Sequence, residues 1–300
     1  MGGLITQEQR ERRINLILSF IFLFRFVTKR DLRLFGSALL GIKYMRRTMQ
    51  YILKNKLIKG FNIKAPVITT GYYLLESGLA KLPKSLLEYK YYFIPARYKP
   101  YIFPHLAGIL EVFLIVQKIA VKGYWISEWM IRQDKIKATG KKGLAGNLGW
   151  RRKGLLRGRL PDGMFVLGKK ARITVEYELT LKNNYDWESM IRNLEYGLRE
   201  REKIDLVTKD IVTGRDFEAV LFVFNEDQTF TSYLRKFDKY ARNGKEEMLE
   251  LGTLNETISL KRYFLSTLEE LKKGHVFRTK GGKVSLSEMF NFVESGAANN

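Results

Sequence analysis

The sequence predicts an α+β protein of two parts. Three helical segments and two short extended segments fill residues 7–74, where apolar residues first recur at helical spacing and then alternate. Residues 160–182, LPDGMFVLGKKARITVEYELTLK, form two further alternating runs around a Gly-Lys-Lys turn, which predicts a β-hairpin. With 300 residues, of which 45% are apolar, the chain is large enough for two hydrophobic cores.

The composition excludes several kinds of site. The chain has no cysteine, which rules out disulfides, thiolate catalysis, zinc fingers and iron–sulfur clusters and fits a reducing cytoplasm. Its two histidines, His105 and His275, are far apart in sequence, so a metal would be a hard, oxygen-bound cation such as Mg²⁺ or Mn²⁺. The longest apolar run, residues 14–26, is shorter than the ~20 residues that span a bilayer. We therefore expect a buried helix there and no membrane insertion.

The positive charge is concentrated in two segments. The net charge is +22, and residues 1–100 carry 19 basic and 5 acidic residues. Residues 135–160 carry 9 basic and no acidic residues, whereas residues 161–300 are nearly balanced. A nucleic-acid backbone is the natural partner of such segments. A charged surface that only maintains solubility is the alternative, and an anionic membrane surface is a weaker one, because the basic residues do not follow one amphipathic helix.

The N-terminal part has the order of a winged helix-turn-helix. Helices are predicted at residues 7–26, 28–35 and 40–54, the first two capped by Thr6 and Thr28, and extended segments follow at 57–64 and 67–74. In this arrangement the third helix enters the major groove of double-stranded DNA, and the hairpin lies beside the backbone. The predicted DNA contacts here are Lys43, Tyr44, Arg46, Arg47, Gln50 and Lys64. The alternative is a small helical domain that binds protein.

The rest of the chain predicts an α/β domain. Residues 83–104 contain five tyrosines and four of the six prolines, which is typical of a linker. Helices are predicted at 105–121, 123–135 and 185–201, with a buried strand at 219–225. The predicted domains are therefore a winged helix at 1–82, an α/β domain at 105–245 and a C-terminal helical extension at 246–300. A Gly-, Lys- and Arg-rich loop at 140–158 supplies further predicted DNA contacts: Arg151, Arg152, Lys153 and Arg157.

Acidic side chains gather on the predicted hairpin. Asp162 precedes one strand, and Glu176, Glu178 and Lys182 share one face of the other, because side chains alternate along a strand. Carboxylates are rarely buried unless they are paired or bind a metal. The three carboxylates predict a seat for a divalent cation and an attacking water, with Lys182 offsetting transition-state charge. Alternatively, these acids pair with cations such as Arg159 and Arg172.

Three short motifs carry a resemblance to a known family. They are a WxSE-type segment (Trp125, Ser127, Glu128), Pro161-Asp162, and the segment from Glu176 to Lys182. In their order they resemble the replication–relaxation proteins of mobile plasmids, which couple a winged helix to a domain like the PD-(D/E)xK restriction endonucleases. Some mobilisation relaxases are described with this fold. The resemblance covers most of residues 7–225.

The resemblance implies a restriction-endonuclease-like domain at residues 105–245. Asp162 and Glu176 would be its metal-binding acids, and Glu128 would match the additional acidic group that many such nucleases carry. The family pattern has lysine two residues after the second acid, whereas this chain has Glu178 there. Lys182 could supply the missing charge, or Glu178 could be a third metal ligand.

Two functions are expected from these observations. The first is a metal-dependent DNA-processing protein that nicks or relaxes a mobile plasmid, or initiates its replication, at a plasmid origin with relaxosome or replication partner proteins. The second, suggested by the missing lysine, is a non-catalytic DNA-binding initiator or mobilisation accessory protein. A tyrosine could link to DNA, and Tyr101, Tyr124 and Tyr177 are near the hairpin in sequence. By strand alternation, Tyr177 should face away from Glu176.

Overall fold

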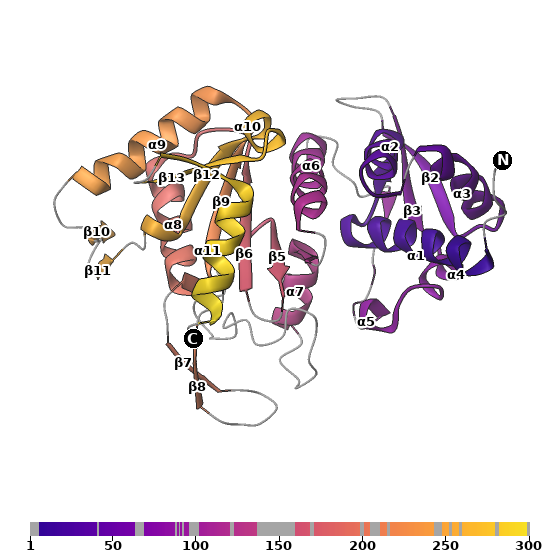
Figure 1. Ribbon diagram of the computed structural model, residues 1–300, viewed down its shortest axis with the longest axis horizontal. Coiled ribbons are helices and arrows are strands. Elements are labelled where there is room, and N and C mark those ends of the chain that lie inside the picture. The colour runs from indigo at the N-terminus through magenta and orange to yellow at the C-terminus, as the bar shows by residue number, and fades with distance from the viewer. Residues whose placement is uncertain are drawn as a thin grey trace. The chain divides into compact units, whose positions relative to one another are not determined.

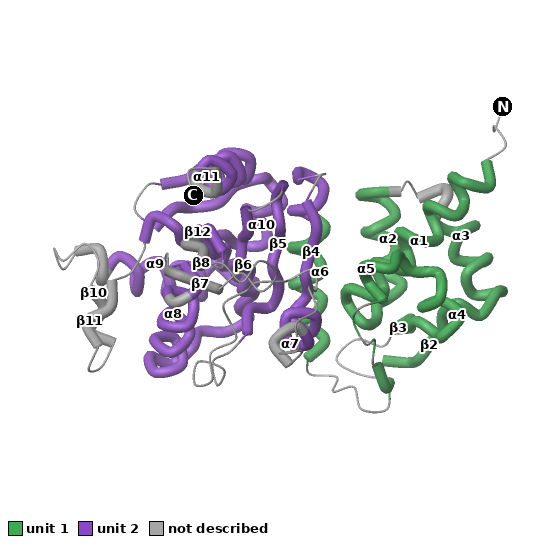
Figure 2. The backbone as a smooth tube through the Cα atoms, turned by 90° about the horizontal axis from the view of Figure 1, so that it is seen from below, with its two compact units in different colours: residues 1–114 green, residues 115–300 purple. Residues whose placement is uncertain are grey.

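The computed structural model divides the chain into two compact units, residues 1–114 and residues 115–300 (Figure 2). The structure describes residues 6–40, 42–63, 69–87, 89, 91, 93–95, 102–120, 123–136, 160–168, 171–198, 201–204, 211–214, 217–242, 248–251, 254–257, 260–279 and 282–298. Within them, no helix is long and apolar enough to cross a membrane.

Unit 1 consists of helices around a small antiparallel sheet (Figure 1). Its elements are α1 (Gln7–Phe24), β1 (Val27–Thr28), α2 (Lys29–Phe35), a π-helical turn (Gly36–Leu40), α3 (Ile42–Lys54), β2 (Ile58–Ile63), β3 (Thr69–Leu74), α4 (Glu76–Leu79), α5 (Lys84–Leu87) and the first part of α6 (Phe103–Ile119). The strand order is β1-β3-β2. The predicted three helices and hairpin are present, and the short strand β1 adds an edge that the sequence did not predict.

Local capping and aromatic packing hold the helices of unit 1. The hydroxyl of Thr6 accepts the backbone N–H of Gln9 at 3.2 Å, which caps α1. Thr28 and Asp31 form a reciprocal capping box at the start of α2. Phe20 of α1 stacks on Phe35 of α2, with ring centroids 4.2 Å apart. The predicted caps at Thr6 and Thr28 are thus confirmed.

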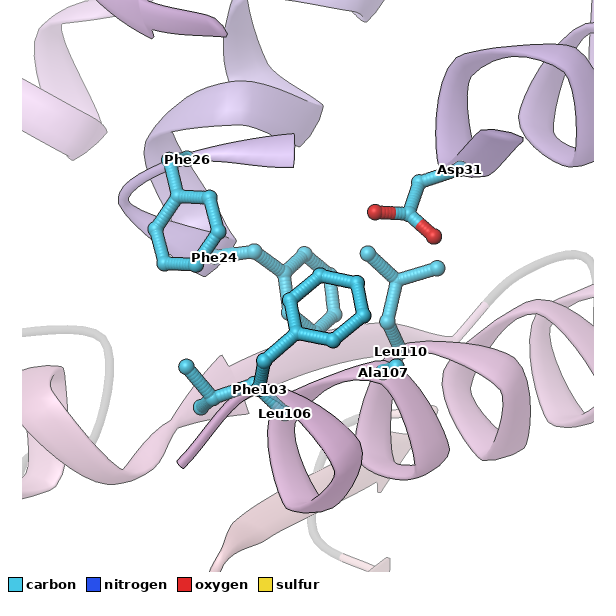
Figure 3. A pocket seen from close by; sticks show the side chains of 7 residues that line it. All are labelled: Phe24, Phe26, Asp31, Phe103, Leu106, Ala107 and Leu110. Carbon is cyan, nitrogen blue, oxygen red and sulfur yellow. The ribbon is translucent and has the colours of Figure 1, made fainter. Parts of the chain in front are cut away.

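A small cavity lies among α1, α2 and the N-terminal part of α6 (Figure 3). Its volume is about 10 Å³, which is at the limit for one water molecule. It is lined by Phe24, Phe26, Asp31, Phe103, Leu106, Ala107 and Leu110. Burial raises the pKa of Asp31, while its hydrogen bonds from Thr28 act in the opposite direction. The cavity is therefore a feature of the core and too small for a ligand.

Unit 2 is built on one mixed sheet, to which seven strands contribute in its described part. Its strands and helices are β4 (Tyr124–Ser127), α7 (Glu128–Ile136), β5 (Gly163–Leu167), β6 (Ala171–Glu178), α8 (Asn184–Leu198), β7 (Arg201–Ile204), β8 (Ile211–Gly214), β9 (Ala219–Phe224), α9 (Asp227–Arg242), β10 (Met248–Leu251), β11 (Leu254–Thr257), β12 (Tyr263–Thr267), α10 (Leu268–Lys272), β13 (His275–Arg278), β14 (Gly282–Ser285) and α11 (Leu286–Ala298). The order in the sheet is β14-β13-β12-β9-β6-β5-β4. The central strands β6, β9 and β12 are parallel, and the outer pairs are antiparallel.

Helices cover both faces of this sheet. On one face, Phe222 of β9 contacts Tyr233 and Phe237 of α9, with ring centroids 6.1 Å apart in both pairs. Helix α8 joins the same layer, because the ring of Trp187 packs edge-on against that of Phe237. On the other face, Phe165 of β5 stacks on Phe290 of α11. Helix α11 is labelled in Figure 1. Side chains that share a face with Phe222 therefore point towards the α8–α9 layer.

Three sequence predictions are wrong in this unit. Residues 123–135 were expected to form one helix, but Tyr124–Ser127 pairs as strand β4 with β5 before α7 begins. Residues 246–300 were expected to be a helical extension, but β12, β13 and β14 continue the sheet. The strand bearing Glu176 ends at Glu178, so Lys182 lies in the connection to α8 and not on the strand.

Candidate functional site

Three of the predicted acidic residues lie near the same end of the paired strands β4, β5 and β6: Glu128 directly after β4, Asp162 directly before β5, and Glu176 on β6. Ser127 pairs with Gly163, and Gly163 pairs with Val175. One position further along these antiparallel registers, Glu128 is opposite Asp162, and Asp162 is opposite Glu176. The backbone N–H of Glu128 donates to the carbonyl of Asp162 at 3.3 Å. Directly opposite residues project from the same face of a sheet, so the continued register places the side chains of Asp162 and Glu176 on one face.

The carboxylate of Asp162 is held by its neighbouring strand. Its Oδ2 accepts the backbone N–H of Tyr177 at 2.8 Å, and the residue is 8% exposed. The adjacent Gly163 leaves room for the indole of Trp125, which occupies the space where a side chain at position 163 would lie. The contact between β4 and β5 thus fixes the start of β5, from which Asp162 projects.

Glu176 and Glu178 lie on the face covered by α8 and α9. Glu176 pairs in register with Phe222, and Glu178 with Phe224 of the same strand. Both glutamates are buried, at 2% and 4% exposure. Burial of two carboxylates on one strand face calls for polar or ionic partners.

Lys182 supplies such a partner. Its ammonium forms an ion pair with the Glu178 carboxylate, and its side chain is only 11% exposed. The structure therefore brings Lys182 to the predicted cluster by a different route, from a connecting segment that folds back onto the strand end. Two arginines were considered as partners for the acids. Arg159 lies outside the described residues, and Arg172 is on β6, where it pairs with Val166 of β5.

Glu128 lies at the start of α7 and is more exposed than the other acids. Its carboxylate pairs with Arg132, one helical turn along, and its side chain is 43% exposed. An exposed pair of this kind contributes little to stability, because water screens both charges. Glu128 can therefore change partners at small energetic cost.

Among the residues that the structure describes, no three Asp, Glu or His side chains are placed to ligate one metal ion. Mg²⁺ commonly binds only one or two carboxylates and keeps several waters, which substrate phosphate can replace. Asp162, directly before β5, and Glu176, on the neighbouring strand β6, are two candidate oxygen donors of this kind. These two residues fit a hard cation, whereas Glu178 is already bonded to Lys182.

Sequence reasoning missed two side chains of the α8–α9 layer. Glu195 of α8 is fully buried, at 0% exposure. Its spacing of four from Ile191 places it on the apolar face of the helix, which was a usable signal. Lys236 of α9 donates from Nζ to the carbonyl of Lys182 at 3.2 Å and lies 5.4 Å from the ring centre of Trp187. Nothing in the sequence indicated this contact across 54 residues.

Burial lowers the pKa of Lys236, and the nearby Glu188 carboxylate acts in the opposite direction. The ammonium is held between an aromatic face and a backbone carbonyl, both of which favour a cation. Lys236 thus fastens the segment that carries Lys182 to helix α9.

The three tyrosines considered as DNA-linking nucleophiles differ in their surroundings. Tyr177 faces away from Glu176, as predicted, and its hydroxyl donates to Oδ1 of Asn225 at 3.1 Å. Tyr124 is 39% exposed, and burial raises the pKa of its phenol. Tyr101 lies outside the described residues.

The predicted DNA contacts of α3 are only partly described. Arg46, Arg47 and Gln50 are exposed, whereas the neighbouring residues Met45 and Thr48 are buried, so this part of α3 has a basic face exposed to solvent. The side chains of Lys43 and Tyr44 are outside the description, as are the following residues: Lys64, Arg151, Arg152, Lys153 and Arg157.

In comparisons with known proteins, no family model, no curated protein and no solved structure matched this chain.

Proposed function

We propose that this protein binds double-stranded DNA and processes it in a metal-dependent reaction, by nicking or relaxing a mobile plasmid at its origin or by initiating its replication there. The observation that carries the proposal is the position of Asp162 directly before β5, one register position from the Gly163–Val175 pair and so next to Glu176 of β6, together with the ion pair between Lys182 and Glu178. Two hard oxygen donors and one cation are the groups that phosphodiester cleavage requires.

Unit 1 supports the DNA-binding part. Its order of helix, short strand, two helices and hairpin is consistent with the winged helix that we propose, in which α3 would enter the major groove. Arg46 and Arg47 are exposed on that helix. The first 100 residues carry 19 basic and 5 acidic residues, which favours a polyanionic partner.

Unit 2 supports the catalytic part. Three antiparallel strands, β4 to β6, are followed by α8 and the parallel strand β9, an order that resembles the core of the restriction endonucleases. Asp162 and Glu176 would hold Mg²⁺ or Mn²⁺. When bound, such an ion lowers the pKa of a water and neutralises phosphate charge. The ammonium of Lys182, shielded from solvent, would offset negative charge that develops on the phosphate.

The direct test is incubation of supercoiled plasmids carrying candidate origins with the protein and Mg²⁺ or Mn²⁺. Open-circular or relaxed product that disappears with EDTA is expected. The absence of any product from a protein that binds these plasmids would reject the catalytic proposal.

One observation favours the alternative of a non-catalytic DNA-binding protein. Position 178 is a glutamate, and its carboxylate forms an ion pair with Lys182, the lysine that would act on the phosphate. This alternative predicts salt-sensitive duplex binding that survives EDTA and is unchanged by replacement of Asp162 or Glu176. Relaxosome or replication proteins would then supply the chemistry.

Lys236→Met is expected to lower the nicking rate about 10-fold, with KM for plasmid unchanged. Removing a group that positions a residue of the site commonly lowers activity about 10–100-fold. The variant loses the hydrogen bond to the carbonyl of Lys182 and frees the segment that presents the Lys182 ammonium. Single-turnover kinetics measure the effect.

Two controls separate positioning from loss of fold. Lys236→Arg keeps a cation and a donor and should recover most of the rate. Arg235→Met changes the adjacent, exposed residue of α9 and should leave the rate unchanged. If the Met and Arg variants of Lys236 are equally impaired, the positioning role is wrong.

A further inference from the structure

Unit 1 contains an open groove of about 430 Å³ between α2, the π-helical turn and the start of β3. It is lined by Lys29, Arg30, Arg33, Leu34, Ser37 and Thr69. None of these residues is among the DNA contacts predicted from the sequence, which place DNA on α3 and the hairpin. The groove is thus a second basic feature of the same unit.

The groove presents cations without matching acids. Lys29 and Arg33 are one helical turn apart and share a face of α2. The one acid of α2, Asp31, is 6% exposed and bonded to Thr28, so it is turned into the core. Within the described residues, neither Lys29 nor Arg33 forms an ion pair.

Arg30 has one acidic neighbour. Its guanidinium lies 3.8 Å from the carboxylate of Glu111, but the arginine side chain is 71% exposed. Such a long, solvent-screened pair contributes little and leaves most of the five guanidinium donors available. The groove therefore has excess positive charge and a surplus of donors, which fits an anion.

The shape and chemistry of the groove indicate what kind of anion fits. Sites for small nucleotides are mostly apolar and bury most of the ligand. This groove has Leu34 as its one apolar lining residue, no aromatic ring for a base, and exposed cations along its edge. Lys29 and Arg33 are about 6 Å apart along the helix axis, at 1.5 Å per residue. That span fits successive phosphates of an extended strand.

We propose that this groove binds backbone phosphates of DNA, next to the segment that α3 contacts. The proposal rests on the proposed DNA-binding function and extends the contact surface to α2 and the edge of β3. Guanidinium forks match phosphate oxygens, and the Thr69 hydroxyl adds a donor beside them. Contacts of this kind fix the position of the protein on the duplex and carry no sequence information.

The test is the salt dependence of duplex binding by the full-length protein. Each lost phosphate contact lowers the slope of log K against log salt by about 0.9. The variant Lys29→Gln with Arg33→Gln should therefore bind a fluorescent duplex more weakly, with the magnitude of the slope reduced by about 1.8. Its preference between a candidate origin and an unrelated duplex should be unchanged.

A matched control removes two exposed cations of unit 1 that do not line the groove. Lys81→Gln with Lys84→Gln makes the same change in net charge and should keep the wild-type slope. If both double variants have the same slope of log K against log salt, the change reflects the overall net charge of the protein, and the proposal that the groove binds phosphates is wrong. Melting temperatures within about 2 °C of wild type would confirm that these surface changes leave the fold intact. Surface substitutions usually change the free energy of unfolding by less than ~0.5 kcal/mol.

Two further outcomes are distinguishable. If the wild-type protein shows no salt-dependent duplex binding, the DNA-binding function itself fails. If the wild type binds DNA and the groove variant keeps its slope, only the groove is wrong. Competition by ATP or inorganic pyrophosphate tests whether the groove binds the phosphates of a small molecule and not those of DNA. Stoichiometric, micromolar binding of either one that is lost in the groove variant would identify a small-molecule site and overturn the DNA proposal.

Discussion

Replacing Glu176 with glutamine is expected to reduce plasmid nicking on the order of 10³-fold, while duplex binding stays unchanged. Glu176 is 2% exposed and opposite Asp162, so glutamine keeps the shape of the side chain and removes one negative charge from the pair of oxygen donors. Removing a single group that stabilises transition-state charge typically costs about 10²–10³ in rate. Nicking of supercoiled plasmid and a filter-binding titration measure the two quantities.

The matched control is Glu269→Gln on α10. This carboxylate is 73% exposed, and its interaction with Lys272 lowers its pKa. The chemical change is identical, and nicking should stay at the wild-type rate. A Glu176→Gln protein that melts like the wild type and nicks at the same rate would exclude Glu176 as a metal-binding acid. The non-catalytic DNA-binding alternative would then gain support.

The hairpin that carries the candidate site was predictable because its information is local. Alternating apolar residues give two strands, and the turn includes Gly168, whose φ of +55° is a conformation that glycine adopts readily. Once the turn is placed, the pairing of β5 with β6 follows, and with it the positions of Asp162 and Glu176 on one face. The pairing of β5 with β6 was therefore predictable from the sequence, whereas the metal-binding role of the two acids stays a prediction.

The C-terminal strands were not predictable in the same way. Tyr263–Thr267 is a short, apolar run that fits a buried strand or a helix equally well. Its structure is decided by parallel pairing with β9, about 40 residues earlier in the chain. Such pairing leaves no local pattern, so the seven-stranded sheet is visible only when the strands are assembled.

Lys182 illustrates an intermediate case. The sequence indicated that this lysine belongs with Glu178, but for the wrong reason, since the strand stops at Glu178. The two side chains meet because the following segment folds back and is tied to α9 by Lys236. Composition and spacing suggested the pair, while a tertiary hydrogen bond accounts for its geometry.

Gly163→Ala is expected to destabilise unit 2 by about 1–3 kcal/mol, the usual cost of inserting a methyl group into a packed core. An added Cβ would overlap the indole ring of Trp125, which is itself 2% exposed and has little room to move. For a unit of this size, the melting temperature should fall by roughly 2–4 °C per kcal/mol. Gly60→Ala in strand β2 is the control, because its nearest neighbour would be 3.4 Å away, an ordinary contact.

The same substitution should also reduce nicking, because Gly163 links the packing of the sheet to the position of Asp162. If the indole is forced away, β4 and β5 separate where the backbone N–H of Glu128 bonds to the Asp162 carbonyl. Adding Trp125→Leu should relieve the overlap, so the double variant should be more stable than the two separate losses predict. Strict additivity would mean that the ring and residue 163 do not touch. Partial recovery of nicking together with stability would instead connect the close approach of Trp125 and Gly163 directly to the position of Asp162, the candidate metal-binding acid.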